Sequence, residues 1–298
     1  FRVISECADQ TGLDCYVIGG FVRDLLMGIK KPKDIDILVV GDGIEIANKV
    51  CEKLNSNSKV NIYKNFRTAA FSYKNMELEF VGSRKESYKF SSRNPRVEIG
   101  TLDDDLNRRD FTINSIGICL NSNKWGKILD KFNGLEDIKN KIIKTPLDPI
   151  KTFSDDPLRM LRGIRFSCQL DFLIQYECLR TISLDKNRIK IISGERISEE
   201  LNKILMTKKP STGFKILYET GILEILLPEL TDLGGIEEVE GHKHKDNFYH
   251  TLEVLDNISQ TTENIWLRWS DLLHDIGKAP TKKFIKIIGW TFHGHELK

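Results

Sequence analysis

Two aspartates, Asp34 and Asp36, stand two positions apart at the start of an otherwise apolar segment that ends at Val40. The segment has the pattern of a strand, whose side chains repeat every two residues, so both carboxylates lie on one face. Two buried acidic groups repel each other, and a divalent cation relieves that repulsion. The pair could bridge two magnesium ions, one activating a hydroxyl and the other holding a triphosphate. An isolated pair of this kind is more often a solvated strand end.

A metal site of this type needs a third carboxylate. Glu79, in the apolar segment 77–81, is the candidate, and Glu77 is the alternative because it shares the same strand face. Upstream, Gly19 and Gly20 separate a strand-like segment from a helix-like one. Glycines let backbone N–H groups approach a phosphate, and the guanidinium of Arg23 can reach the same anion. A Gly-Gly turn before a helix is, however, more often structural than ligand-binding.

Three parts of different pattern must position these residues. The first, 1–145, mixes short strands with helices, and its pattern predicts an α+β fold. The second, 146–235, has helical spacing of apolar residues, and the third, 236–298, contains all six histidines. The chain ends within a patterned region, so the third part is expected to be incomplete. The strands predicted for the first part are 15–18, 35–40, 68–73 and 77–81, with a helix over 44–54.

The amino-acid composition indicates a globular protein without a membrane span. Hydrophobic residues make up 40% of the 298 positions, and no apolar run is long enough for a membrane span. The six cysteines are far apart without a C-x-x-C pair, and the N-terminal residues do not form a signal peptide, so reduced thiols and a cytoplasmic location are predicted. The net charge is +2, so a nucleic-acid surface requires local clustering. Such clustering occurs at 180–215, where nine Lys/Arg face four Asp/Glu.

Several motifs together resemble a known family. The run Gly19-Gly20-x-Val22-Arg23-Asp24, followed by Asp34-x-Asp36, resembles the signature of polymerase-beta-type nucleotidyltransferases. Within these, it is most similar to the bacterial class II CCA-adding enzymes and poly(A) polymerases. The segment 84–101 resembles the flexible loop of this family. The block Arg108-Arg109-Asp110-Phe111-Thr112-x-Asn114 resembles its R-R-D-F-T-x-N motif, with Ser115 where alanine is frequent.

The resemblance implies a fold and a set of roles. The implied fold is a polymerase-beta-like head with a mixed or antiparallel sheet, followed by an all-α neck, body and HD-type domain. Two Mg²⁺ ions are implied as cofactors. The two adjacent guanidiniums, a carboxylate and an amide can grip phosphate and ribose oxygens, although a salt-bridged helix start is the simpler alternative. Implied catalytic residues are Asp34, Asp36 and Glu79, and implied nucleotide-binding residues are Gly19, Gly20, Arg23, Arg109, Asp110 and Asn114.

A second motif concerns the choice of base. Asp156 and Arg159 are three residues apart at a predicted helix start, which by itself indicates an ordinary ion pair. The motif also resembles the family's base-reading E-D-x-x-R, with Asp155 in place of glutamate. Cytosine and adenine each present an amino donor beside a ring-nitrogen acceptor, which matches a carboxylate beside a guanidinium. Guanine and uracil would leave buried groups unpaired. Arg162 is included in the nucleotide-binding set.

The histidine-rich third part resembles the start of an HD-type phosphohydrolase domain. His250 precedes Leu272-Leu273-His274-Asp275-Ile276-Gly277-Lys278, and imidazoles with a carboxylate suit a transition metal. His293 and His295 could supply a further ligand. The family pattern needs a downstream aspartate that does not occur before the chain ends, so a working hydrolase site is doubtful.

The predicted activity is addition of C and A to the 3′ end of tRNA from CTP and ATP, without a nucleic-acid template and with release of pyrophosphate. Variants that add poly(A), A alone or CC alone remain open, although the complete segment 84–105 disfavours CC addition. Other classes are an HD-type phosphohydrolase and a non-catalytic RNA-binding protein. The oligomeric state stays open, and no membrane partner is expected. Basic residues predicted to contact tRNA are Lys186, Arg188, Lys190, Lys203, Lys208 and Lys209.

Overall fold

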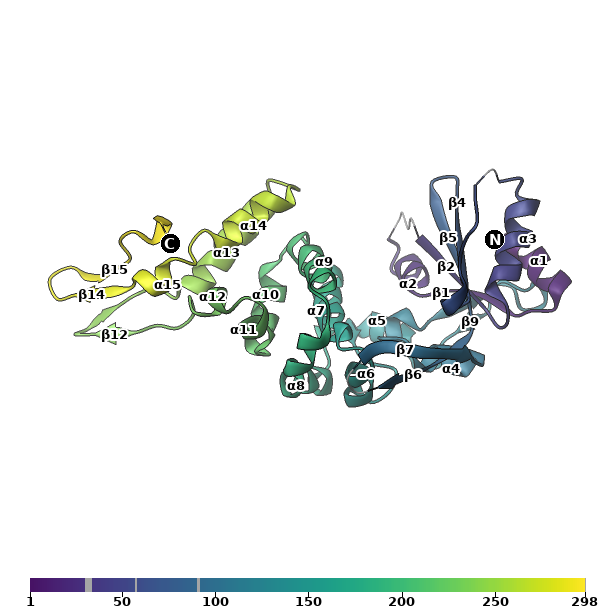
Figure 1. The fold of residues 1–298 in the computed structure, drawn as a ribbon, viewed down its shortest axis with the longest axis horizontal. Helices are drawn as coiled ribbons and strands as arrows, with labels where there is room; N and C mark the ends of the chain where they lie inside the picture. Colours follow the sequence, from purple (N-terminus) through teal and green to yellow (C-terminus); the bar gives the residue numbers. More distant parts are fainter. Residues whose placement is uncertain (30–33, 57, 90–91, 298) are drawn as a thin grey trace. The chain divides into compact units, whose positions relative to one another are not determined.

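The chain divides into two compact units, Phe1–Asp155 and Asp156–Lys298, each of which is described by itself (Figure 1). The computed structural model describes residues 1–29, 34–56, 58–89 and 92–297. The head predicted over 1–145 lies within the first unit. The three-part division stays a prediction, as does the boundary at 235.

A seven-stranded mixed sheet forms the centre of the first unit, in the order β3-β4-β5-β2-β1-β8-β9. Strands β2 and β5 pair in parallel, and the other neighbours pair antiparallel. The predicted strands are confirmed to within a residue or two at their ends, and so is the mixed sheet. The strand bounds are β1 Cys15–Ile18, β2 Asp34–Val39, β3 Asn61–Tyr63, β4 Thr68–Tyr73, β5 Met76–Gly82, β8 Gly117–Cys119 and β9 Ile128–Leu129.

The two faces of this sheet have different coverings. Helices α1 (Arg2–Thr11) and α3 (Gly43–Lys53) pack on the face that carries Ile35 and Ile37, and this packing forms the larger apolar core. Figure 1 shows both helices on the same side of the strands. Leu38 belongs to a smaller cluster, because alternate residues of a strand point to opposite faces. Asp34 and Asp36 have the parity of Leu38, so they lie on the face opposite α1 and α3.

Shorter elements complete the first unit. Strands β6 and β7 form a separate antiparallel hairpin that precedes α4. The start of α4 carries a capping box, in which Thr101 and Asp104 satisfy each other's backbone N–H groups. The bounds are α2 Gly20–Leu26, η1 Lys64–Phe66, β6 Arg84–Lys89, β7 Ser92–Ile99, α4 Leu102–Asn107, η2 Thr112–Asn114, η3 Ser122–Lys124, α5 Gly134–Asn140, β10 Ile142–Ile143 and α6 Pro149–Asp155.

The second unit is mainly helical, as the apolar spacing predicts. Helices α7 and α9 are joined by a buried ion pair in which Arg165 Nε lies 2.7 Å from Glu200 Oε2. The bounds are α7 Leu158–Leu170, β11 Leu173–Ile174, α8 Tyr176–Leu184, η4 Lys186–Ile191, α9 Gly194–Leu205, α10 Ser211–Glu219, α11 Ile222–Leu226, α12 Pro228–Thr231, α13 Asn247–Ser259, α14 Ile265–Leu273, α15 Lys278–Thr281 and η5 His295–Leu297.

The prediction that the C-terminal part is all-α is wrong in one respect. Two short antiparallel pairs occur there, β12 (Glu238–Val239) with β13 (His242–Lys243), and β14 (Lys283–Ile285) with β15 (Gly289–Thr291). Gly241 and Gly289 have φ values of 78° and 86°, a left-handed conformation that glycine adopts without strain and that suits tight turns. These two glycines therefore favour tight turns between short strands in a part of the chain that was expected to be helical throughout.

Arg268 on α14 connects the C-terminal ends of two other helices in the second unit. Its guanidinium is buried and donates to the carbonyl oxygens of Leu205 (2.7 Å), Thr207 (2.9 Å), Ser259 (2.8 Å) and Thr262 (2.8 Å). These carbonyls follow the ends of α9 and α13, where the helix leaves acceptors without an internal partner. One side chain thereby satisfies the backbone of several segments at once.

Replacing Arg268 with methionine is expected to lower the free energy of unfolding of this unit by about 3 to 5 kcal/mol, because the buried carbonyls lose a charged donor. Denaturant unfolding followed by tryptophan fluorescence measures this, since Trp266, Trp269 and Trp290 all lie in the second unit. The exposed Arg180 on α8 provides the control, and Arg180→Met should change stability by less than about 0.5 kcal/mol. Equal losses in the two variants would contradict the assignment.

Two further findings concern composition. All six cysteines are free thiols, as predicted. Over the described ranges, no helix combines the length and the hydropathy needed to cross a membrane.

Candidate active site

The parallel pairing of β2 with β5 brings the predicted acidic residues together. Asp36 is the register partner of Glu79, and Asp34 is the partner of Glu77. Register partners in adjacent strands point to the same face, so these carboxylates share the face opposite α1 and α3. Asp34, Glu77 and Glu79 are exposed, whereas Asp36 is half-buried. The sheet therefore forms an acidic surface whose inner pair is Asp36 and Glu79.

The negative charge of this surface affects the pKa of Glu79. Desolvation and the nearby Asp36 carboxylate raise the pKa of Glu79 above its ordinary value, and the guanidinium of Arg84 offsets part of this. Carboxylate oxygens are the donors that Mg²⁺ prefers, and a cation would relieve the repulsion that raises this pKa. The donor set thus fits Mg²⁺ in its chemistry. As they stand, no three acidic, histidine or cysteine side chains among the described residues lie close enough together to hold a metal ion.

The turn at Gly19 lies directly beside Asp36. Gly19 has φ 84°, and a Cβ atom placed there would lie 3.2 Å from Asp36 Oδ2 and 3.6 Å from Arg109 Nη1. Glycine is therefore required both by backbone conformation and by the close approach of two charged groups. A negative and a positive side chain meet at this turn. The predicted glycine turn, aspartate and arginine are brought to one place by the fold.

A chain of hydrogen bonds links α2 to the segment after α4. Arg23 Nη1 donates to Asn114 Oδ1 at 2.8 Å, and Asn114 Nδ2 donates to Asp110 Oδ1 at 3.1 Å. The backbone N–H of Phe111 also donates to Asp110 Oδ1, at 2.8 Å. Arg23, Asp110 and Asn114 are all buried. Three residues predicted to bind nucleotide thus form one connected polar group, which fixes their orientation.

Arg109 has donor capacity left over. Its Nη1 makes a long contact of 3.5 Å to the carbonyl oxygen of Asn114, and its Nη2 donates to Asp105 Oδ2 at 3.1 Å. Its Nε is buried and has no hydrogen-bond partner among the described residues. Buried donors are normally paired, so the unpaired Nε of this side chain is consistent with a ligand supplying the acceptor.

The motif predicted to read the base lies at the start of α7 in the second unit. The backbone N–H of Arg159 donates to the Asp156 carbonyl oxygen at 3.0 Å, and Asp156 Oδ1 accepts from the N–H of Leu158 at 3.2 Å. Arg159 is buried and Asp156 is half-buried. Arg162 lies one turn later, with its guanidinium 5.3 Å from the centroid of the Phe166 ring. The Asp156 side chain therefore accepts the first N–H of α7, a structural role that it holds in addition to any role in base reading.

The predicted RNA-binding residues separate into two groups. Lys203, Lys208 and Lys209 line one cavity of about 640 Å³ together with Thr207 and Thr212. Lys186, Arg188 and Lys190 belong instead to η4. The ammonium group of Lys186 is already 3.1 Å from Glu224 Oε2. The first group is thus the more concentrated basic surface.

The structure does not gather the predicted metal-site residues of the histidine-rich segment. Asp275 is buried, and its Oδ2 lies 2.6 Å from Lys278 Nζ and 3.2 Å from His274 Nε2. Its Oδ1 lies 3.7 Å from His295 Nε2. His250 lines a separate pocket with His242 and Lys278. An ammonium group thus already neutralises Asp275, and no three possible ligands are gathered here among the described residues. The transition-metal site stays a prediction, and the HD-type domain is not shown.

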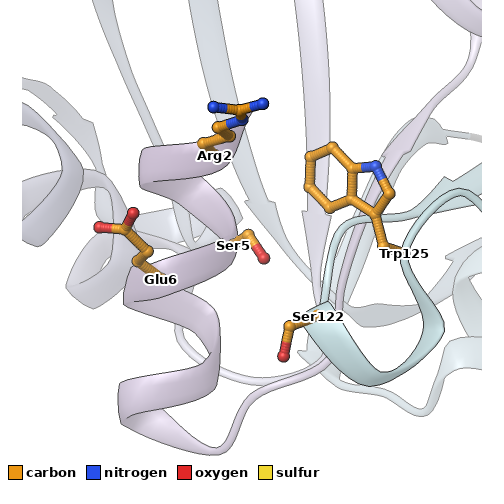
Figure 2. A pocket seen from close by; sticks show the side chains of 5 residues that line it. All are labelled: Arg2, Ser5, Glu6, Ser122 and Trp125. Carbon is orange, nitrogen blue, oxygen red and sulfur yellow. The ribbon is translucent and has the colours of Figure 1, made fainter.

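A further pocket lies beside α1, away from the residues predicted to act in catalysis (Figure 2). It is lined by Arg2, Ser5 and Glu6 of α1 and by Ser122 and Trp125, which follow β8; Ser5 lies on the side of the helix towards these two residues, and Glu6 points away from them. Asp9 Oδ2 accepts from the backbone N–H of Ser122 at 3.2 Å and ties this loop to α1. Since α1 covers the face opposite Asp36, the pocket is separate from the acidic surface.

Two acidic residues near the site were not predicted to matter. Asp105 is fully buried between Arg108 and Arg109, and Glu86 on β6 contacts Arg84 and Arg108. The signal available in the sequence was spacing, because Asp105 precedes the two arginines by three and four residues on one helical path. The run Asp103-Asp104-Asp105 hides which of its members is buried.

Comparison with known proteins defines the class first. Residues 15–144 match the poly A polymerase head domain, and residues 171–233 match a probable RNA and SrmB-binding site of polymerase A. The first unit thus contains a head domain of the polymerase A type, which the glycine turn and acidic strand had indicated.

More specifically, the chain is similar to tRNA nucleotidyltransferases and CCA-adding enzymes. It is 31% identical to an A-adding tRNA nucleotidyltransferase of Geobacter sulfurreducens over 279 residues, covering 92% of this chain and 28% of that protein. It is 32% identical to a multifunctional CCA protein of Mannheimia succiniciproducens, covering 92% of this chain and 65% of that protein. The chain thus spans less than two thirds of the length of these curated relatives.

A solved structure supports the same relationship. A tRNA nucleotidyltransferase complexed with a primer tRNA and an incoming ATP analog superposes with a TM-score of 0.69 at 26% identity, covering 91% of this chain and 75% of that one. The fold predicted for the first part, an α+β head with a mixed sheet, is therefore confirmed by structure and by homology.

Proposed function

We propose that this chain carries out tRNA nucleotidyl transfer, adding C and A to the tRNA 3′ end from CTP and ATP without a nucleic-acid template. One observation carries the proposal: the Gly19 turn holds the Asp36 carboxylate and the Arg109 guanidinium within a few ångströms of the same backbone position. Such a turn can accept a nucleoside triphosphate, with its phosphates towards Arg109 and its reacting phosphorus towards Asp36. Homology to enzymes that add CCA or A alone supports the substrate class.

The side chains of the head have separable tasks in this proposal. Arg109 and the backbone at Gly19 and Gly20 bind the phosphates, and Asp110 with Asn114 binds the ribose. Arg23 orients Asn114 through the 2.8 Å hydrogen bond between them. Nothing in this group distinguishes one base from another, so the head positions any ribonucleotide for in-line attack.

The acidic surface would hold the cofactor. Asp34, Asp36 and Glu79 are the proposed ligands of Mg²⁺, in two ions, which would supply activation of the tRNA 3′-hydroxyl and neutralisation of the departing pyrophosphate. Glu79 must be ionised to serve as a ligand, and its raised pKa means that protons compete for this position at a higher pH than for an ordinary glutamate.

Base choice belongs, in this proposal, to Asp156 and Arg159. A carboxylate acceptor beside a guanidinium donor matches the amino group and ring nitrogen that cytosine and adenine share. The fixed polarity of the pair accounts for the use of CTP and ATP and for rejection of UTP and GTP, whose edges present the reverse order.

The cavity lined by Lys203, Lys208 and Lys209 is the proposed contact for the tRNA backbone. Replacing all three with glutamine is expected to reduce the slope of log affinity against log salt by about 2 to 3, since each phosphate contact contributes about 0.7 to 0.9. Filter binding between about 50 and 200 mM salt measures the slope. Lys186→Gln is the control for loss of one lysine outside the cavity and should reduce the slope by less than about 1, because it removes at most one phosphate contact. An unchanged slope in the triple variant would remove the cavity from the tRNA contact.

One experiment tests the activity and separates its variants. The protein is incubated with Mg²⁺, each single NTP or all four together, and tRNA ending before C, after CC or after CCA, and the product lengths are read. With CTP and ATP present, extension that stops after CCA supports the proposal. Addition of A alone to tRNA ending in CC indicates an A-adding enzyme, and long A tails indicate a poly(A) polymerase. No extension by any NTP would refute nucleotidyl transfer by this chain.

A further inference from the structure

A network of buried charges connects the hairpin β6–β7 with the proposed nucleotide site. Its centre is Asp105 on α4, a fully buried carboxylate. Arg108 Nε donates to Asp105 Oδ1 at 2.9 Å, and Arg109 Nη2 donates to Asp105 Oδ2 at 3.1 Å. Each carboxylate oxygen therefore holds a different guanidinium. Although burial alone would raise it, the pKa of Asp105 is lowered, because both guanidiniums favour the ionised carboxylate.

The other end of the network is Glu86 on β6. Its Oε1 lies 2.7 Å from Arg84 Nε and 3.4 Å from Arg108 Nη1, and its Oε2 accepts from Tyr88 Oη at 2.6 Å. The side chain of Glu86 is only 4% exposed. Arg108 is thereby shared between two buried carboxylates and serves as the link from the hairpin to Asp105.

The charges of this network do not cancel. Three guanidiniums, those of Arg84, Arg108 and Arg109, face two carboxylates, those of Glu86 and Asp105, so formally one positive charge remains. Both carboxylates contact Arg108, whereas Arg109 has Asp105 as its one acidic partner within the described ranges. Arg84 and Arg109 stand at the two ends of this network, each with one carboxylate partner in it, and Arg109 is the end that lies beside the Gly19 turn.

We infer that Asp105 is a positioning residue that holds the Arg109 guanidinium towards the phosphates of the bound nucleotide. This inference rests on the proposed function and assigns Asp105 a role in it. Asp105 occupies Nη2 of Arg109, and Nη1, which makes only a 3.5 Å contact to the Asn114 carbonyl oxygen and lies 3.6 Å from a Cβ placed at Gly19, is left to donate to an anion at this turn. A guanidinium fixed at one end loses less rotational freedom when it binds, which favours phosphate binding.

A purely structural role is the alternative, because buried ion pairs also stabilise loops and helix ends. The two roles differ in one respect. If Asp105 acts through Arg109, its removal should matter for nucleotide binding only while Arg109 is present. If it supports the fold in general, its removal should weaken binding by the same factor in either background.

A double-mutant cycle makes this test with ATP and Mg²⁺ in the absence of tRNA. Asp105→Asn is expected to weaken ATP binding by about 10- to 30-fold in the wild-type background and by less than about 2-fold in the Arg109→Ala background. Asp103→Asn is the matched control on the same helix, since Asp103 is 70% exposed and pairs with Lys131 at 2.8 Å. It should leave ATP binding within about 2-fold of wild type.

Equal weakening in both backgrounds, or unchanged affinity in Asp105→Asn, would overturn the inference. If Asp105→Asn does not fold, as judged by circular dichroism, Asp105→Glu enters the same cycle, because it keeps the charge and displaces the guanidinium. Primer extension by the wild-type chain is measured in parallel. Coupled ATP binding without extension refutes the proposed function alone, and extension without coupling refutes the positioning role alone.

Discussion

Asp36→Ala is expected to abolish primer extension with every nucleotide, by about a thousandfold or more in kcat/KM, while tRNA binding stays close to wild type. The loss corresponds to several kcal/mol of transition-state stabilisation, which is what a bound metal contributes in phosphoryl transfer. Asp36 is the residue expected to be most sensitive, because it lies beside both Glu79 and the Gly19 turn. Single-NTP extension and filter binding with tRNA are the two measurements.

The strand itself offers a matched control for this prediction. Glu79→Gln and Glu77→Gln make the same chemical change two residues apart on one face of β5. Glu79 pairs in register with Asp36 and Glu77 with Asp34, so Glu79→Gln should reduce extension strongly and Glu77→Gln much less. Near wild-type extension by Asp36→Ala would refute the metal-binding role of the acidic surface. A larger loss in Glu77→Gln than in Glu79→Gln would move the third ligand to Glu77.

The local elements of the head could be predicted because each has a local cause. Alternating apolar residues define β2 and β5, and Asp42 marks the start of α3 by accepting from the N–H groups of Ile44 and Glu45. The pairing of β2 beside β5 has no local cause, since it depends on register between segments about forty residues apart. The sequence alone therefore left Glu77 and Glu79 as alternatives on the same face.

The parts that were missed depend on tertiary contacts. Asp103, Asp104 and Asp105 look alike in the sequence, yet Asp103 pairs with Lys131, Asp104 takes part in the capping box and Asp105 is buried between two arginines. The pattern around Asp275 suggests a metal ligand. In the fold, Lys278, one helical turn later, supplies the positive charge instead. The residue types thus indicate which kinds of interaction are possible, and the burial and neighbours of each residue in the fold determine which of those interactions it makes.

Asp156 and Arg159 are expected to control base choice and to leave the chemical step intact. Sites that recognise a ligand by buried hydrogen bonds reject an analogue lacking the match by about 10⁴-fold, so losing one partner should bring UTP or GTP to within about tenfold of CTP and ATP. Arg159→Ala removes the donor. Asp156→Asn is preferred to Asp156→Ala, because an asparagine oxygen can still accept from the N–H of Leu158 and preserve this hydrogen bond at the start of α7.

Asp156→Asn is the more informative variant, because it predicts a gain in UTP incorporation. An asparagine presents an N–H₂ donor where the aspartate presents only acceptors, so the carbonyl of uracil gains a partner there, while its ring N–H still faces the Arg159 guanidinium. Asp156→Asn should therefore gain UTP incorporation in single-NTP extension, rather than merely lose incorporation of CTP. Arg180→Ala, an exposed arginine of the same unit, controls for general effects and should keep the wild-type preference. Unchanged discrimination in both motif variants would place base choice elsewhere in the chain and leave the acidic surface with its proposed metal chemistry.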